Sequence, residues 1–431
     1  MSRVLVLGAY GLIGAGVVRH LQAMGHEVIG LGRNAKTARR SFPDLDWRIA
    51  DLRGLTNTTA WDEVLQGIDA VVNCAGALQD GGEDDLAAVH HDMLVALGKE
   101  AAARGVQVVQ ISAAGVRPDA STAFFRTKAD GDAALLASGA PVWILRPGLV
   151  IAQQAYGGTQ LLRMLSAVPW VQPMALGKAP VQCVGLGDLC QAVEDALAGR
   201  LPRGQPIDLV EDTPHPLREV VAAHRLWLGF APARLTLPMP RILLPLVGRM
   251  ADGLGRLGWR SPLRSTALAV LRDGITGDPT AFREACGQVA SLDQILTRIP
   301  VGTEHRLQAR LALLMPLILL GLSIFWILSG VMGVISLPQA AGVLTQVGWS
   351  DMAAKTAVLF WSAVDITIGL ALLWRRHAAR ACIAMIVVSL IYLVSASLLT
   401  PQLWFDPLGP LVKVIPVILS AMLLRVLLEE R

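Results

Sequence analysis

Short apolar runs alternate with periodic segments along the first half of the chain. Residues 4–7, 70–73, 106–111 and 142–145 form runs rich in valine, isoleucine and leucine, which are typical of strands buried on both faces. The segments between them place apolar residues three or four positions apart, as helices packed on a sheet do. Repetition of these units predicts an α/β fold with a doubly wound parallel sheet, whose ligands bind beyond the C-terminal ends of the strands.

The second half of the chain has a different pattern, with four long apolar stretches at about 311–335, 354–374, 381–400 and 408–425. Each is close to the roughly 20 residues that a helix needs to cross a bilayer core. Charge follows the same division, because residues 311–431 contain only 12 charged side chains and residues 1–310 contain the other 60. We therefore expect a four-helix transmembrane bundle, with the lipid bilayer as a partner.

Basic residues mark one side of the expected bundle. They precede the first helix, join the second to the third and follow the fourth: Arg306, Arg310, Arg375, Arg376, Arg380, Arg425 and Arg431. The opposite loops contain only Asp351, Lys355 and Asp406. By the positive-inside rule, this asymmetry predicts a multi-pass protein of the cytoplasmic (inner) membrane, with the soluble half and the C-terminus in the cytoplasm.

Two ionisable residues lie within the apolar stretches, where charge is expensive and is usually retained for a reason. Asp365 falls near the centre of the second stretch, and Lys413 about two turns into the fourth. One interpretation is a structural pair that fixes helix packing, with outward snorkelling of Lys413 as a variant. The other is a proton or quinone role for Asp365.

A glycine-rich turn follows the first strand directly and opens the first helix. Strand, turn and helix in this order are the context in which helix amides hold a pyrophosphate. We expect the cofactor contacts of this turn to come from Gly8, Tyr10, Gly11, Leu12, Ile13 and Gly14. The sequence thus predicts a Rossmann-like NAD(P) site over residues 1–150, a variable lobe over 151–305 and the transmembrane domain over 306–431.

The end of the second predicted strand carries a cation. Arg33 comes 19 residues after Gly14, where NAD-specific folds place an acidic residue for the ribose hydroxyls. A guanidinium suits a 2′-phosphate instead, so NADP(H) is favoured over NAD(H). Arg39 and Arg40 are available to help, although solvated surface arginines are the commoner case.

Composition excludes several other classes of function. The net charge is +4 with no Lys/Arg run longer than two, so we expect no nucleic-acid partner. The five cysteines are scattered and the histidines have no ligand spacing, so we expect no metal site and a reducing compartment. His90 and the other histidines are interpreted as structural or solvated. The chain enters its first strand at once, so no export signal is expected before the fold.

These pieces together resemble the short-chain dehydrogenase/reductase superfamily in its extended or atypical branch. The resemblance rests on the glycine spacing, Arg33, Asp51-Leu52, the turn Asn73-Cys74-Ala75-Gly76, Ser112, Lys128 and Arg146-Pro147-Gly148. It implies that Asp51 and Leu52 border the adenine, Ala75 and Gly76 the cofactor ribose, and Lys128 the nicotinamide ribose. The overall arrangement of these motifs is similar to that in the accessory NAD(P)-binding subunit of respiratory complex I. The last 120 residues resemble the DoxX-like membrane family.

The chain departs from the superfamily at the residue that matters most for catalysis. Catalytic members place a tyrosine four residues before the lysine to transfer a proton, and here that residue is Phe124. Ser112 remains available to bind a carbonyl oxygen, or to act as a cap or turn residue. Among the three tyrosines, only Tyr156 lies where substrate loops occur, and it is either a substitute proton donor or a packing residue.

Residues 242–259 form an apolar segment interrupted by Arg249 and Arg256, too polar to span a membrane. It either lies along the cytoplasmic membrane surface or covers the substrate lobe. For the whole chain two functions stay open. One is a membrane-anchored NADPH-dependent oxidoreductase that passes reducing equivalents to a lipid-soluble acceptor such as a quinone. The other is a catalytically silent NADP(H)-binding sensor or assembly scaffold at the membrane. The sequence does not indicate an oligomeric state.

Overall fold

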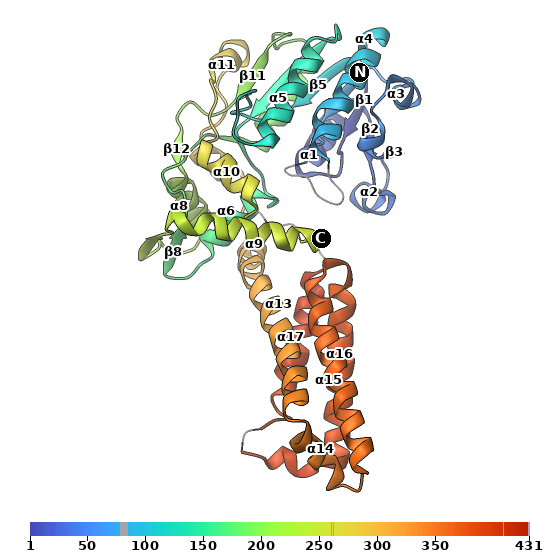
Figure 1. The fold of residues 1–431 in the computed structure, drawn as a ribbon. Helices are drawn as coiled ribbons and strands as arrows, with labels where there is room; N and C mark the ends of the chain where they lie inside the picture. Colours follow the sequence, from blue (N-terminus) through green and yellow to red (C-terminus); the bar gives the residue numbers. More distant parts are fainter. Residues whose placement is uncertain (78–84, 260, 262, 408, 430–431) are drawn as a thin grey trace. The chain divides into compact units, whose positions relative to one another are not determined.

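The computed structural model describes residues 1–77, 85–259, 261, 263–407 and 409–429. The chain divides into two compact units (Figure 1). Unit 1 comprises Met1–Asp252 and Ser261–Arg306, and unit 2 comprises Gly253–Arg260 and Leu307–Arg431. Residues on both sides of position 150 therefore share unit 1, and the division of this unit at that position stays a prediction.

Unit 1 is built on a seven-stranded sheet in the order β11-β6-β5-β4-β1-β2-β3. Every pairing in it is parallel, which confirms the predicted doubly wound fold. Its strands are β1 (Arg3–Leu7), β2 (Glu27–Gly32), β3 (Asp46–Ile49), β4 (Ala70–Asn73), β5 (Gln107–Ile111), β6 (Val142–Pro147) and β11 (Pro206–Leu209). The chain winds away from β1 in both directions, so the strand order reverses between β1 and β4, the place where folds of this kind bind their ligands.

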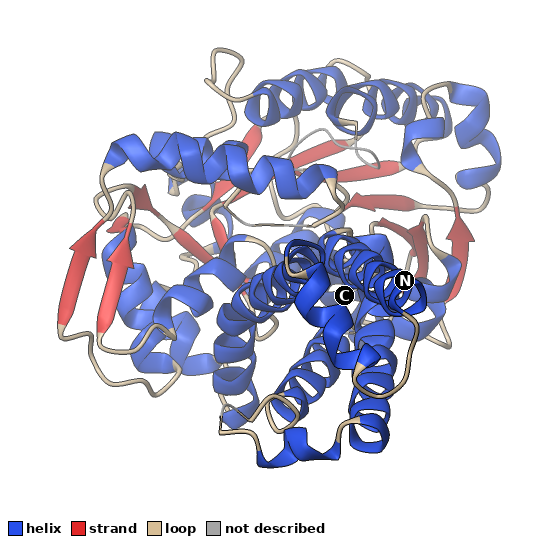
Figure 2. Ribbon diagram, turned by 60° about the horizontal axis from the view of Figure 1, so that its bottom comes forward, coloured by secondary structure: helices blue, strands red, loops and turns tan. Residues whose placement is uncertain are grey.

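Helices cover both faces of this sheet, as Figure 2 shows with helices in blue and strands in red. Val4 and Val6 of β1 pack in one core with α1 (Leu12–Ala23) and α7 (Leu186–Leu197). Leu5 and Leu7 pack in a second core with α3 (Thr58–Val64), α4 (Met93–Arg104) and the end of α5 (Ala123–Leu136). Because alternate side chains of one strand enter two different cores, the strand appears in the sequence as an unbroken apolar run.

The rest of unit 1 forms a smaller lobe with its own core around Leu162, Val181, Val220 and Ile295. Short strands pair here: β7 (Leu149–Ile151) with β10 (Cys183–Gly185), β8 (Val171–Met174) with β13 (Leu235–Pro238), and β9 (Pro180–Val181) with β12 (His215–Pro216). The lobe's helices include α6 (Gly158–Ser166), α8 (Leu217–Trp227), α9 (Leu244–Arg256), α10 (Ser265–Asp273) and α12 (Leu292–Arg298), although α9 continues into unit 2 from Gly253. Helix α11 (Thr280–Cys286) instead packs on the main sheet through Phe282.

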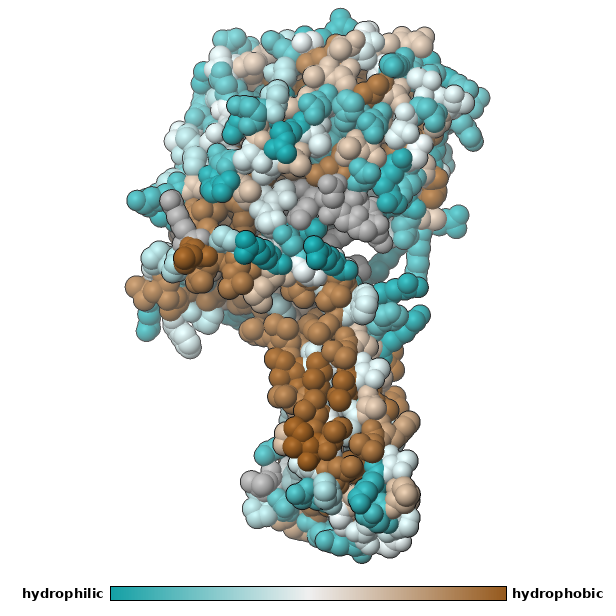
Figure 3. Space-filling view, viewed as in Figure 1, coloured by the Kyte–Doolittle hydropathy of each residue, from teal (hydrophilic) through white to brown (hydrophobic). Residues whose placement is uncertain are grey.

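Unit 2 is helical. Among the described residues, α13 (Thr303–Ile335), α15 (Asp351–Leu373) and α16 (Arg375–Leu399) are long and apolar enough to cross a membrane. The shorter helices are α14 (Leu337–Thr345) and α17 (Val414–Leu427). Figure 3 shows hydrophobic residues, in brown, over the outer surface of the long helices.

Two expectations about the membrane stretches need correction. The fourth stretch, expected at 408–425, is a helix of 14 residues that begins only at Val414, because Gly409 adopts a φ of 56° and Pro410 precedes the helix. Lys413 is consequently the N-terminal cap of α17, not a residue two turns inside it.

Candidate nucleotide and substrate site

The glycine turn after β1 has no room for a side chain at its first and last glycines, Gly8 and Gly14. A Cβ atom on Gly14 would lie 2.2 Å from the carbonyl oxygen of Gly8, and Gly8 itself has a φ of 69°. The Gly11 N–H donates to that same Gly8 oxygen at 2.8 Å. Helix α1 then begins at Leu12 without a side-chain cap, so its first amides remain available as donors to an anion.

Tyr10 connects this turn to the end of β2. Its hydroxyl accepts a hydrogen bond of 3.2 Å from the Arg33 N–H, and a Cβ atom on Gly32 would lie 2.3 Å from the tyrosine ring. Tyr10 therefore positions the backbone of Arg33, whose side chain is exposed. Leu12 and Ile13, the first residues of α1, are half-buried beside the turn.

Arg33 lies near the acid predicted to border the adenine. Asp51 accepts hydrogen bonds from Arg53, with Nη2 at 2.6 Å, and caps the short helix that begins at Leu52. These bonds, together with a weaker contribution from the charge of Arg33, hold the pKa of the Asp51 carboxyl below its ordinary value. Arg53 is a residue that sequence reasoning missed, because its link to Asp51 depends on the tight turn between them.

The turn after β4 is held by a buried histidine. The Ala75 N–H donates to Asn73 Oδ1 at 3.1 Å, and the Ala77 N–H donates to His90 Nε2 at 3.1 Å. Since Nε2 accepts, Nδ1 carries the proton and faces Thr127 Oγ1 at 3.0 Å. Burial, with the nearby charge of Lys128, lowers the pKa of His90 to about 3, so the ring is neutral.

His90 lies in a single π-helical turn, Ala88–Asp92, that runs into α4. Such turns are frequent at functional sites. The turn packs closely on α5, because a Cβ atom on Gly131 would lie 1.8 Å from the His90 carbonyl oxygen. The histidine is thus structural, as expected, but it shapes the predicted ribose-binding turn at Ala75 and Gly76.

Lys128 is buried beside that turn. Its Nζ donates to the Ile111 carbonyl at 3.3 Å and lies 5.7 Å from the centre of the Phe124 ring. A Cβ atom on Gly76 would lie 3.8 Å from the same Nζ. The structure therefore brings together Gly76, Lys128 and Phe124, and burial lowers the pKa of the lysine. Phe124, at the position of the usual tyrosine, contacts the His90 ring edge-on, and its phenyl ring has no proton to transfer.

Ser112 belongs to a buried polar network. Its hydroxyl donates to Asp132 Oδ2 at 2.8 Å, and Arg146 donates to the same oxygen from Nε at 3.1 Å and Nη2 at 3.0 Å. Burial raises the pKa of Asp132, while the Arg146 guanidinium opposes the shift. The Ser112 proton is thus engaged by Asp132, and carbonyl binding by Ser112 stays a prediction.

Tyr156 lies in the exposed loop between β7 and α6. Its backbone N–H donates to Thr159 Oγ1 at 3.1 Å, and its ring is largely open to solvent. Within the described part of the chain, no hydrogen bond or ring contact joins it to Lys128 or Phe124. Its assignment as a proton donor therefore stays a prediction.

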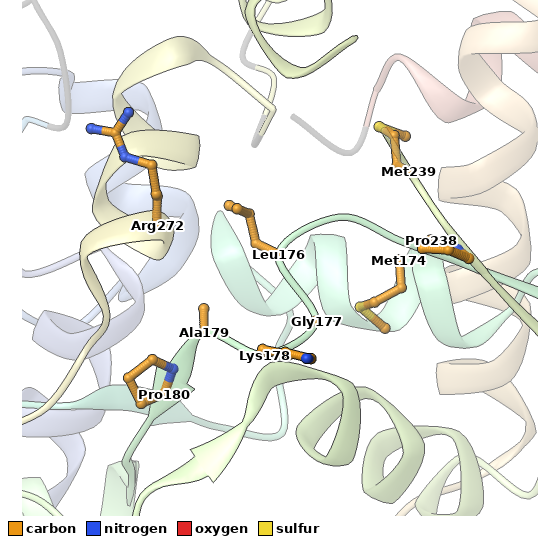
Figure 4. Close-up of a pocket in the computed structure, with 9 residues that line it drawn as sticks. All are labelled: Met174, Leu176, Gly177, Lys178, Ala179, Pro180, Pro238, Met239 and Arg272. Atoms are coloured by element: carbon orange, nitrogen blue, oxygen red, sulfur yellow. The ribbon is translucent and has the colours of Figure 1, made fainter. Parts of the chain in front are cut away.

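A hollow of about 340 Å³ lies in the smaller lobe. It is lined by the segment from Met174 to Pro180, by Pro238 and Met239, and by Arg272 of α10 (Figure 4). The lining is mostly apolar, with Lys178 and Arg272 as its cations. Helix α10 also lies close to Phe124 and Phe125 of α5, because Val270 packs in the same hydrophobic cluster.

In unit 2, Asp365 is buried and satisfied by hydroxyl groups. Tyr392 donates to Asp365 Oδ1 at 2.8 Å, and Ser329 donates to Oδ2 at 3.0 Å. These bonds connect α13, α15 and α16. Lys413 is exposed, and the described residues contain no ion pair between it and Asp365.

Two known protein families match parts of the chain, one within unit 1 and one within unit 2. Residues 4–165 match the NAD dependent epimerase/dehydratase family, and residues 323–422 match the DoxX-like family. A domain similar to the epimerase/dehydratase family is thus joined to a domain similar to the DoxX-like family. The predicted resemblance to short-chain dehydrogenase/reductase enzymes and to the DoxX-like family is thereby confirmed.

The epimerase-type domain is similar to proteins from several organisms. Protein FMP52, mitochondrial, of Eremothecium gossypii is 29% identical over 154 residues, which are 35% of this chain and 67% of that protein. The Escherichia coli NADPH-dependent quinone oxidoreductase QOR2, solved with NADPH, has a TM-score of 0.52 at 17% identity and covers 68% of this chain and 98% of its own.

The Bordetella bronchiseptica enzyme WbmG, solved with NAD, has a TM-score of 0.50 at 19% identity and covers 68% of this chain and 91% of its own. These likenesses show the fold of unit 1, which it shares with proteins solved with NAD or NADPH. One of the two structures holds NADPH and the other NAD, so they do not indicate which of the two cofactors this chain prefers.

Proposed function

We propose that the protein is a membrane-anchored NADPH-dependent oxidoreductase whose acceptor is a lipid-soluble molecule of the quinone class. One observation carries the proposal. The glycine turn after β1, which has no room for a side chain at Gly8 or Gly14, belongs to the same chain as a DoxX-like domain. One helix would be enough to anchor the protein, so a multi-helix domain exceeds what anchoring requires. The same chain would thus hold a hydride-carrying cofactor and a lipid-soluble acceptor.

The residues of the turn fit a dinucleotide. The uncapped amides at Leu12 would hold the pyrophosphate, and Ala75, Gly76 and Lys128 would border the riboses. When bound, the cofactor supplies a hydride. The exposed guanidinium of Arg33, its backbone held by Tyr10, favours a 2′-phosphate over a free ribose hydroxyl.

The absence of a phenol at Phe124 suits a quinone better than an alcohol or sugar. Reduction of a quinone to the hydroquinone consumes one hydride and one proton, and water can supply that proton. The mostly apolar hollow bounded by α10 is our candidate for the acceptor's ring or chain, because this helix also packs beside Phe124.

We further propose that unit 1 and the C-terminus lie in the cytoplasm, on the arginine-rich side of the inner membrane. Asp365 is assigned a structural role, because its two hydrogen bonds join three helices and satisfy both carboxyl oxygens.

A second candidate function is a catalytically silent NADP(H)-binding sensor or scaffold. Two observations favour it: Phe124 replaces the proton donor, and the Ser112 hydroxyl is engaged by Asp132. In this case the nucleotide would stabilise unit 1 or report its redox state to a membrane partner.

Oxidation of NADPH by the full-length protein in proteoliposomes, with a short-chain quinone, tests the proposed function. We expect NADPH to be oxidised faster than NADH, and Arg33→Ala to raise the KM for NADPH about tenfold, which corresponds to the loss of one charge-assisted contact. Arg117→Ala, at another exposed arginine, is the control and should leave KM unchanged. Tight NADPH binding without oxidation by any quinone or aldehyde would contradict the enzyme and support the silent carrier.

Phe124→Tyr separates the two candidates further. Because quinone reduction does not need a phenol, we expect the variant to reduce the quinone at the wild-type rate within about twofold. Phe124→Leu, which removes the ring without adding a hydroxyl, is the matched control. New aldehyde reductase activity in the tyrosine variant alone would identify a degenerate carbonyl-reducing site instead, measured as aldehyde-dependent loss of NADPH absorbance.

A further inference from the structure

Helix α9 exposes its large apolar residues, whereas a helix on the surface of a soluble protein usually buries them. Its buried positions are small, Gly248 and Ala251, and a Cβ atom on Gly248 would lie 3.2 Å from Ser265 Cα. Leu246 and Met250 are 54% and 64% exposed. A helix on a globular domain normally buries such residues and exposes its polar ones, so the outer face of α9 needs an apolar partner.

The exposed stripe continues onto neighbouring segments of unit 1. Ile242, just before α9, is 83% exposed, and Leu235 and Leu237 of β13 are also exposed. Trp170 is 68% exposed, and its carbonyl accepts a backbone hydrogen bond from Arg234, the residue before β13. Figure 3 shows hydrophobic residues gathered where Figure 1 draws α9 and β8. We call the set Trp170, Leu235, Leu237, Ile242, Leu246 and Met250 the apolar face.

Charges beside the apolar face are positive. Arg249 and Arg256 are exposed and seven residues apart, so they lie on one side of α9, next to the stripe of Leu246 and Met250. The helix contains one acidic residue, Asp252, which accepts from the Ser265 N–H at 3.3 Å on the inner side. An outward apolar stripe flanked by arginines, with an exposed tryptophan nearby, is the arrangement of helices that lie in a lipid headgroup layer.

The chain that follows α9 is attached to the ends of membrane helices. Within unit 2, the Arg375 N–H donates to the Leu257 carbonyl at 2.9 Å, and Trp259 Nε1 donates to the Leu373 carbonyl at 2.6 Å. Leu373 ends α15 and Arg375 begins α16, so residues 257–259 are held where two membrane-crossing helices meet. Helix α9 therefore ends within a few residues of the ends of two helices that are long and apolar enough to cross a membrane.

We propose that the apolar face is a lipid-binding surface, with Leu246, Met250 and Ile242 inserted among acyl chains and Arg249 and Arg256 on lipid phosphates. This assignment does not depend on the oxidoreductase proposal. It selects the first of the two interpretations of residues 242–259, because a segment that only covered the lobe would turn its large apolar side chains inward.

Depth-sensitive quenching in the full-length protein tests this proposal. Single cysteines at Ile242, Met250 or the control position Met24, an exposed residue at the end of α1, are labelled with bimane in a Cys286→Ser background. The parent without a new cysteine gives the background labelling. Vesicles of phosphatidylcholine and phosphatidylglycerol, with or without brominated acyl chains, hold the protein, and iodide is the aqueous quencher.

We expect brominated lipid to quench the labels at positions 242 and 250 several-fold more than the label at position 24, with the order reversed for iodide. Iodide quenching at 242 and 250 equal to that at 24 would overturn the proposal, since the face would then lie in water. Shielding from both quenchers would also overturn it, because a protein surface, such as a second copy of the chain, would then cover the face. NADPH oxidation plays no part in either readout.

Discussion

Gly14→Ala is expected to weaken NADPH binding to the full-length protein by about 100-fold or more, equivalent to at least ~2.7 kcal/mol. The added Cβ atom would lie 2.2 Å from the Gly8 oxygen, 2.9 Å from the Gly8 carbonyl carbon and 3.0 Å from Ala9 Cα. All three are backbone atoms, so relief of the contact requires the turn itself to move. Movement of the turn displaces the amides that would hold the pyrophosphate.

Equilibrium binding, followed by the fluorescence of the reduced nucleotide, measures this effect. Gly187→Ala is the matched control, because Gly187 also lies in the first turn of a helix but has nothing within 4 Å of an added Cβ atom. Undiminished NADPH affinity in Gly14→Ala would mean that the nucleotide does not use this turn. A lowered unfolding midpoint would instead attribute the loss to stability, so the midpoint is recorded for both variants.

Asp132→Asn is expected to destabilise unit 1 by about 3–5 kcal/mol, the range for breaking a buried ion pair. The carboxylate accepts two bonds from Arg146 and one from Ser112, and its charge opposes the lowering of the pKa of buried Lys128. Asparagine keeps the shape but removes the charge. Two cations would then remain in a site from which most water is excluded.

Urea-induced unfolding of the full-length protein in detergent micelles measures this loss as a lower midpoint. Asp130→Asn is the control, because Asp130 lies on the same helix, two residues away, with its side chain exposed. Its substitution should change the free energy of unfolding by no more than about 0.5 kcal/mol. Equal midpoints for the two variants would show that the network contributes little to the stability of unit 1.

Local patterns explain why much of the fold and the local geometry of the candidate nucleotide site could be predicted. The strands β1 and β4 appear as unbroken apolar runs because both faces of the sheet are covered. The glycine spacing could be interpreted because a side chain at Gly14 would collide with the backbone of Gly8, only six residues away. Lys128 and Phe124 share a helix face at a spacing of four, so their proximity needs no tertiary information.

The contacts that prediction missed join residues that are far apart in the sequence. His90 bonds to Ala77 in one direction and Thr127 in the other, and its surroundings make it neutral and structural. The Ser112 hydroxyl is oriented by Asp132, which Arg146 in turn holds from another strand. None of these partners is identifiable from spacing, because each comes from a different segment that the sheet brings together.

The sequence by itself determined the α/β sheet, the glycine turn, the cation at Arg33 and the apolar helices, because each depends on neighbouring residues or on periodicity. Only the tertiary structure decided which way α9 faces, since the same apolar residues suit either a lobe cover or a lipid surface until Gly248 and Ala251 are seen to form the inner side. It also decided that Asp365 is satisfied by Tyr392 and Ser329, because a hydrogen bond between helices depends on how they pack, which residue order does not specify.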